Sequence, residues 1–123
     1  MLVTQPLALV FYQKLMPGSQ LVNRLQDLHY RVTAISEADK LLLGAGNEGP
    51  MIIFLDLDSP DALALIDKLR ANNSTSHIPL VVFGPENEAR SDSARQKGAT
   101  LVVGETALLS HLPGLLEQAL RID

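Results

Sequence analysis

The chain contains no cysteine and no tryptophan, and aromatic residues make up only 4% of its 123 positions. The absence of cysteine excludes disulfides, thiolate metal sites and cysteine nucleophiles. It is also consistent with a reducing compartment. Because rings are so scarce, the core has to be built from aliphatic side chains.

An excess of basic residues is also missing. The sequence has 10 Lys and Arg against 14 Asp and Glu, which gives a formal net charge of −4 at pH 7. Phosphate backbones are bound by clustered Lys and Arg, so we expect no nucleic-acid binding by this domain. No apolar run approaches the roughly 18 residues of a membrane-spanning helix, and no basic region followed by an apolar run opens the chain. We therefore expect a cytoplasmic protein without membrane contact.

What is present is the composition of a globular chain, 46% hydrophobic and 20% charged. The length suits one domain. No internal repeat, low-complexity tract or linker divides the sequence, so residues 1–123 are expected to form a single domain.

Short apolar runs alternate with longer amphipathic stretches. The runs predict five strands, at Leu7–Tyr12, Tyr30–Ile35, Met51–Leu57, Ile78–Phe83 and Leu101–Val103. The alternation predicts an α/β fold, a doubly wound five-stranded parallel sheet of the flavodoxin-like, three-layer α/β/α type. The middle run is apolar throughout, as expected of a strand that helices cover on both faces.

Local signals predict where the five intervening helices begin and end. Three serines are candidate N-caps: Ser19 after Pro17-Gly18, Ser36, and Ser59 before Pro60. A polar helix over 86–97 is expected to end at Gly98 in a left-handed cap. The last helix lies within Ala107–Arg121, where Pro113-Gly114 either kinks the helix or marks its true start.

In such sheets, sites lie beyond the carboxyl ends of the strands. The residues found there include Tyr12 and Gln13 after the first strand, Asp56 and Asp58 after the third, Gly84 after the fourth and Glu105 after the fifth.

Several stretches resemble the receiver domain of bacterial response regulators. The stretch Ile52–Pro60 is similar to the third receiver strand, with Asp56 where the phosphoacceptor aspartate stands. The stretches His29–Val32, His77–Gly84 and Gly98–Val103 resemble the entries to the second, fourth and fifth strands. The likeness runs in order along essentially the full chain. It implies the receiver fold and a role in two-component signal transduction.

The resemblance fails at the phosphorylation site. Receiver domains hold Mg²⁺ with an acidic pair after the first strand plus the acceptor aspartate, and they place Ser or Thr after the fourth strand and Lys after the fifth. Here the acidic pair is missing at Tyr12 and Gln13, the hydroxyl is missing at Gly84, and Glu105 replaces the lysine. Of this set only Asp56 remains.

These losses remove the groups that stabilise a phosphoryl group, because that stabilisation comes from Mg²⁺ and fixed cations. Glu105 would in addition repel a phosphoryl group carrying roughly −1.5 to −2 charges. We therefore predict a pseudo-receiver that is not an enzyme, uses no cofactor and acts through protein–protein contacts. It would serve as a stand-alone adaptor or as one piece of a longer regulator.

Alternatives remain at the level of sequence. Asp56 and Asp58, with Glu105, could form an unconventional Mg²⁺ site in a phosphorylatable receiver, and Lys14 could supply the missing cation. A small molecule could also occupy the same crevice. The favoured interpretation of Asp56 is a strand-end carboxylate that accepts backbone N–H groups at the start of the next helix.

The closing helix has more leucine than one core-facing stripe needs, which allows a homodimer or partner surface there.

Overall fold

The computed structural model describes residues 5–13, 15–84 and 88–121. Five strands form one sheet in the order β2-β1-β3-β4-β5, and every neighbouring pair is parallel. The strands are β1 (Leu7–Phe11), β2 (Arg31–Ile35), β3 (Ile52–Asp56), β4 (Leu80–Gly84) and β5 (Leu101–Gly104). This confirms the doubly wound parallel sheet that the sequence predicts.

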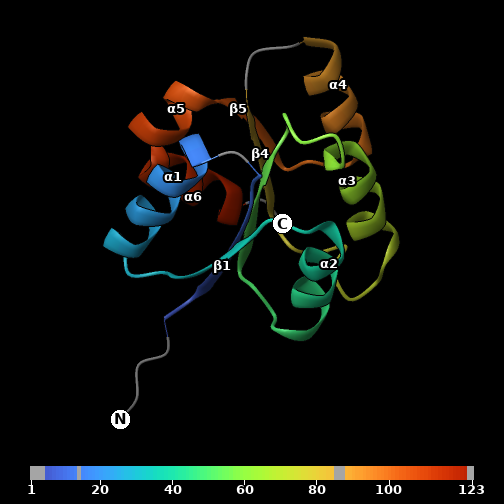
Figure 1. Cartoon of the computed structure of the whole chain (residues 1–123), viewed down its shortest axis with the longest axis horizontal. Coiled ribbons are helices and arrows are strands. Elements are labelled where there is room, and N and C mark those ends of the chain that lie inside the picture. Colours follow the sequence, from blue (N-terminus) through green and yellow to red (C-terminus); the bar gives the residue numbers. More distant parts are fainter. Residues whose placement is uncertain (1–4, 14, 85–87, 122–123) are drawn as a thin grey trace.

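Helices cover both faces of the sheet. They are α1 (Leu15–Asp27), α2 (Ala38–Asn47), α3 (Ala62–Ala71), α4 (Glu88–Lys97), α5 (Glu105–Ser110) and α6 (Leu112–Arg121). Figure 1 shows α1, α5 and α6 on one side of the sheet and α2, α3 and α4 on the other. The three layers follow from parallel pairing, because each crossover has to lay its helix on a face.

The core consists of two clusters, one on each face of the sheet. Alternate residues of β3 enter different clusters: Ile53 and Leu55 pack beneath α2 and α3, whereas Ile52 and Phe54 pack beneath α1, α5 and α6. This follows from the two-residue period of a strand. Every position of β1, β3 and β4 is buried, which fixes the carboxyl ends of these strands in a rigid frame.

The helix starts differ from those expected. Helix α1 begins at Leu15 and contains Pro17, so the prediction that Ser19 caps this helix is wrong. A proline is tolerated there because the first turn of a helix has no intrahelical partner for its N–H groups. Helices α2 and α3 have Glu37 and Asp61 as N-caps, without side-chain capping bonds, instead of the expected serines.

The closing segment is two helices. It starts at Glu105, two residues earlier than expected, and is interrupted at His111. Pro113 is the second residue of α6, so the proline marks a true helix start. The expected left-handed cap is confirmed at Gly98, whose φ is +117°.

The leucines of α5 and α6 pack against the sheet. Leu108, Leu112 and Leu116 are buried, and Leu109, Leu115 and Leu120 are partly buried against the same core cluster. Packing within the chain therefore accounts for the leucine content that had allowed a dimer surface.

Within the described ranges, none of the helices combines the length and apolar character needed to cross a membrane.

Candidate functional site

Asp56 is the last residue of β3 and is only 4% exposed. Its Oδ1 accepts the backbone N–H of Asp58 at 2.9 Å, and its carbonyl accepts the N–H of Ser59 at 3.2 Å. The carboxylate thus closes the turn that leads into α3, in the manner of an Asx turn. This supports the interpretation of Asp56 as a strand-end carboxylate that accepts backbone bonds. The side chain of Asp58 lies on the exposed surface of the same turn.

Tyr12 directs its ring onto helix α1. A Cβ placed on Gly18 would lie 2.2 Å from Cγ of Tyr12, so the ring lies in the space left by the glycine. Tyr12 also packs against the core cluster on this face of the sheet. The first of the two positions that carry acids in receiver domains is therefore used for packing.

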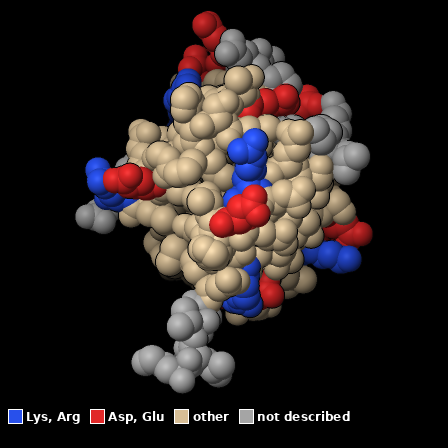
Figure 2. Space-filling view, turned by 90° about the vertical axis from the view of Figure 1, so that its left-hand side faces the viewer, with Lys and Arg blue, Asp and Glu red and all other residues tan. Residues whose placement is uncertain are grey.

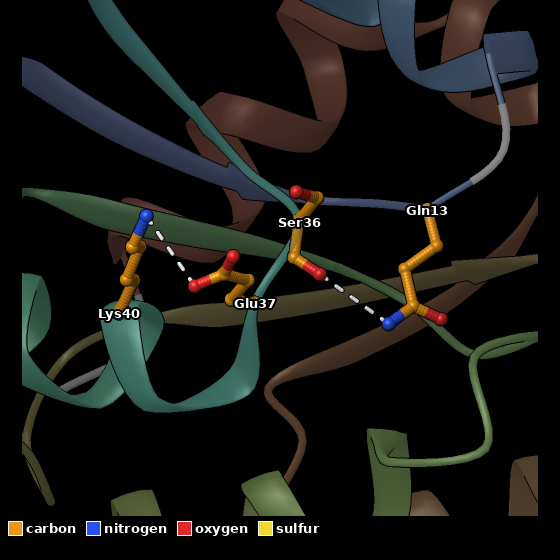
Figure 3. Close-up of polar contacts among 4 residues, drawn as sticks. All are labelled: Gln13, Ser36, Glu37 and Lys40. Atoms are coloured by element: carbon orange, nitrogen blue, oxygen red, sulfur yellow. Dashed lines mark hydrogen bonds and ion pairs between the residues drawn. The ribbon is translucent and has the colours of Figure 1, made fainter.

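Gln13 uses both ends of its amide to join loops. Its Nε2 donates to the carbonyl of Ser36 at 3.3 Å, as Figure 3 shows, and its Oε1 accepts the hydroxyl of Ser59 at 3.2 Å. The loops after β1, β2 and β3 are thereby tied together. Ser59 Oγ in turn accepts the N–H of Asp61 at 3.3 Å. We call the contacts of Gln13 with Ser36 and Ser59 the amide clasp.

An open pocket of about 400 Å³ lies beside the amide clasp and is lined by Tyr12, Gln13, Ala34, Ile35 and Ser36. Near it, Nζ of Lys40 pairs with Oε2 of Glu37 at 3.3 Å (Figure 3). Both of these side chains are more than 60% exposed, so the pair contributes little to stability. Among the described residues, the side chains that line the pocket are uncharged and offer no fixed charge to a phosphate.

Gly84 directly faces the loop that follows Asp56. A Cβ at Gly84 would lie 3.3 Å from Cβ of Leu57 and 3.5 Å from the amide nitrogen of Asp58. Leu57 is buried, so a larger residue at position 84 would make a tight contact with this loop. At the position where receiver domains have a hydroxyl, the backbone of the loop after Asp56 lies close to Gly84.

Glu105 is exposed and is the first residue of α5. The preceding Gly104 pairs with Gly84, and Asp56 pairs with Phe83, so β4 separates Glu105 from the strand of Asp56. A carboxylate in the first turn of a helix is favoured by the helix dipole. Glu105 therefore stabilises the start of α5, at the position where receiver domains place a lysine.

Arg90 is a residue of the site that the sequence analysis missed. It lies in the first turn of α4, and its Nη2 donates to the carbonyls of Leu57 at 2.6 Å and Ser59 at 3.2 Å. No sequence signal indicated this role, because the predicted helix over 86–97 places Arg90 beyond the first turn as one of several charged residues. Lys14, the other cation considered, lies outside the described residues.

The described acidic side chains near Asp56 do not gather into a cluster of metal ligands. Mg²⁺ requires hard oxygen ligands in octahedral geometry, usually one or two carboxylates. Within residues 5–13, 15–84 and 88–121, no group of three or more His, Cys, Asp or Glu side chains is placed to hold a metal. The oxygen of Gln13 is bonded within the amide clasp. Asp56, Asp58 and Glu105 therefore do not gather into a three-carboxylate group in the described part of the chain.

Solved structures with the same fold are receiver domains and response regulators. A putative response regulator from Chloroflexus aurantiacus matches 97% of the chain and all of its own length, with a TM-score of 0.87 and 14% identity. The chemotaxis response regulator CheY4 of Vibrio cholerae matches 94% of the chain and 99% of its own length, with a TM-score of 0.82 and 17% identity. The receiver domain of NtrX from Brucella abortus gives the same coverage and TM-score with 24% identity.

The likeness confirms the receiver fold. The chain spans only 26% of the longer NtrX chain that was solved in complex with ADP. No protein-family model matches the sequence, and no curated protein matches it.

Proposed function

We propose that this chain is a receiver-like signalling module that acts through protein–protein contacts without phosphorylation of Asp56. In this proposal it is a cytoplasmic binding module, not an enzyme, and it uses no cofactor. The carrying observation is the amide clasp, in which Gln13 bonds to Ser36 and Ser59 at the place where a receiver domain needs acids for Mg²⁺.

The electrostatics around Asp56 support the proposal. An acyl phosphate is stabilised by a metal ion and fixed cations aimed at its oxygens. Here the fifth strand is followed by the carboxylate of Glu105 in place of a cation, and Gly84 offers no hydroxyl. Arg90 is the described cation next to this loop, and its Nη2 is bonded to backbone carbonyls. A phosphoryl group on Asp56 would therefore find little fixed positive charge to stabilise it.

The surface supports a protein as the partner. Figure 2 shows that uncharged side chains cover most of the face formed by α1, α5 and α6, with basic and acidic side chains close together near its centre. A groove of about 290 Å³ between the end of α1 and the α5–α6 junction lies among Arg24, Asp27, Leu28, Leu109, Ser110, Leu112 and Pro113. Four of these lining residues, Leu28, Leu109, Leu112 and Pro113, are apolar, and apolar side chains are typical of the centre of protein–protein interfaces. The match to one part of the longer NtrX chain is consistent with an attached output domain or a separate signalling partner.

The experiment is phosphorylation by a small phosphodonor. The protein is incubated with Mg²⁺ and acetyl phosphate, with a phosphorylatable receiver domain as the positive control and the Asp56→Asn variant as the matched negative control. Intact mass spectrometry then reads out the product. We expect no added phosphoryl group. A stoichiometric gain of one phosphoryl group that the Asp56→Asn variant loses would establish the alternative, a working receiver with an atypical metal site.

A further inference from the structure

The peptide group between Leu57 and Asp58 lies between an anion and a cation. Its N–H donates to Oδ1 of Asp56 at 2.9 Å, and its carbonyl accepts Nη2 of Arg90 at 2.6 Å. A trans peptide points its N–H and C=O in opposite directions, so a single planar group bridges the two side chains. We call this arrangement the peptide bridge.

Hydrogen bonds in such a chain strengthen one another. A carboxylate that accepts from the N–H polarises the peptide and makes its carbonyl oxygen a better acceptor, and the guanidinium does the same from the other side. Bonds to a charged group are about twice as strong as bonds between neutral groups. Removing the charge of Asp56 therefore weakens the bond between the carbonyl of Leu57 and Arg90 through the peptide group that both side chains contact.

Helix α4 is the element that depends on this bond. Only Ala94 of its ten residues is buried, so apolar packing contributes little to holding it. It lies beside α3 (Figure 1). The end of α4 is held by the bond of 2.7 Å between Nζ of Lys97 and Oδ2 of Asp67, and its first turn is held by Arg90. A helix with so few buried apolar contacts belongs to the least stable part of a fold.

We propose that the charge on Asp56 sets how firmly the first turn of α4 is held, with the peptide bridge as the connection and Arg90 as the positioning residue. Neutralising the Asp56 carboxylate, or binding another group to it, would weaken the attachment of α4. Conversely, a partner that binds α4 would change the hydrogen bonding of Asp56. The proposal stands whether or not Asp56 accepts a phosphoryl group, so it does not depend on the proposed function.

The test is amide hydrogen exchange measured by NMR on the whole chain. Asp56→Asn keeps an oxygen for the N–H of Asp58 and removes the charge. We expect the amides of α4 to exchange roughly fivefold faster in this variant, which corresponds to a loss of about 1 kcal/mol. Amides of α2 serve as the internal reference for any change in global stability. Arg90→Met should give the same α4-specific increase, and Arg90→Lys, which keeps a cation, should restore part of the protection.

The double variants separate coupling from general weakening. Asp56→Asn should have no further effect on α4 when Arg90 is already Met. It should keep its full effect in an Asp67→Asn background, where the other attachment of α4 is broken. An unchanged α4 in the Asp56→Asn variant, or equal effects of this substitution in both backgrounds, would overturn the proposal. If Asp56→Asn does not fold, unchanged α4 exchange in the Arg90→Met variant overturns it.

Discussion

Arg70 holds together the loops at the amino ends of the strands, opposite the candidate site. Its Nε donates to the carbonyl of Gly98 at 2.9 Å, and its Nη1 donates to the carbonyls of Ser76 at 2.9 Å and Ile78 at 2.7 Å. Nη2 donates to Oγ1 of Thr100 at 3.3 Å. Partial burial lowers the pKa of this guanidinium, because desolvation disfavours its charged form. With four of its five N–H donors bonded within the chain, the residue is structural.

The first prediction concerns this residue. Arg70→Met should lower the free energy of unfolding by about 2–3 kcal/mol, because partly buried carbonyls lose their donors. Urea denaturation followed by circular dichroism measures the loss. Arg95→Met, which breaks an exposed pair with Asp92, should change stability by less than about 0.5 kcal/mol. Equal effects of the two substitutions would show that Arg70 does not hold these loops.

A second prediction tests the packing of Tyr12 on Gly18. Alanine usually stabilises a helix relative to glycine by roughly 0.5–1 kcal/mol. Here Gly18→Ala should instead destabilise the protein by about 1–2 kcal/mol, because the new Cβ would meet the tyrosine ring. In a Tyr12→Ala background the same substitution should become stabilising. Chemical denaturation of the four proteins in this double-mutant cycle gives the answer, and a Gly18→Ala effect of the same sign in both backgrounds contradicts the described packing.

At the scale of elements, α6 is a core helix that uses its leucines inward. Leu116→Ala should lower the free energy of unfolding by about 2–5 kcal/mol, because Leu116 is buried beneath the sheet. Leu43→Ala in α2 should cost far less, because Leu43 is 63% exposed. Thermal denaturation of both variants compares them. Similar melting temperatures, or a loss of a dimer on Leu116→Ala in sedimentation, would instead indicate that this helix faces a partner.

The elements also show which features the sequence could predict. The strands were predictable because β1, β3 and β4 are apolar at nearly every position, a pattern that depends only on burial on two faces. The starts of the helices were less predictable than the strands. Ser36 and Ser59 resemble N-caps in the sequence, but in the structure the hydroxyl of Ser59 donates to Gln13 in the turn after β3. Local propensity does not contain that competing contact.

The missed site contacts have a common cause. Gln13 and Ser59 are 46 positions apart, and Arg90 lies 31 and 33 positions from the two carbonyls that it contacts. Such bonds depend on how the loops of different crossovers meet at the sheet edge. The sequence alone shows that Tyr12, Gly84 and Glu105 stand where receiver domains have an acid, a hydroxyl and a lysine. The contacts that Tyr12 and Gln13 make instead could be identified only from the structure.

At the scale of the whole molecule, the fold has kept the frame of a receiver domain and changed its charged edge. The sheet order and the two core clusters leave the carboxyl ends of β1, β3 and β4 side by side. At that edge, Gln13 and Arg90 form hydrogen bonds that join loops of different crossovers. Under the proposed function, the module signals through contact with a partner.

Under the proposed function, the Asp56 carboxylate does not hold a phosphoryl group. Beryllium fluoride with Mg²⁺ mimics an aspartyl phosphate, and its binding can be followed by ¹H–¹⁵N NMR titration of the whole chain. We predict that the amide signals of Leu57, Asp58 and Gly84 do not move as the reagents are added. A saturable shift of these signals, absent in the Asp56→Asn variant, would contradict the account.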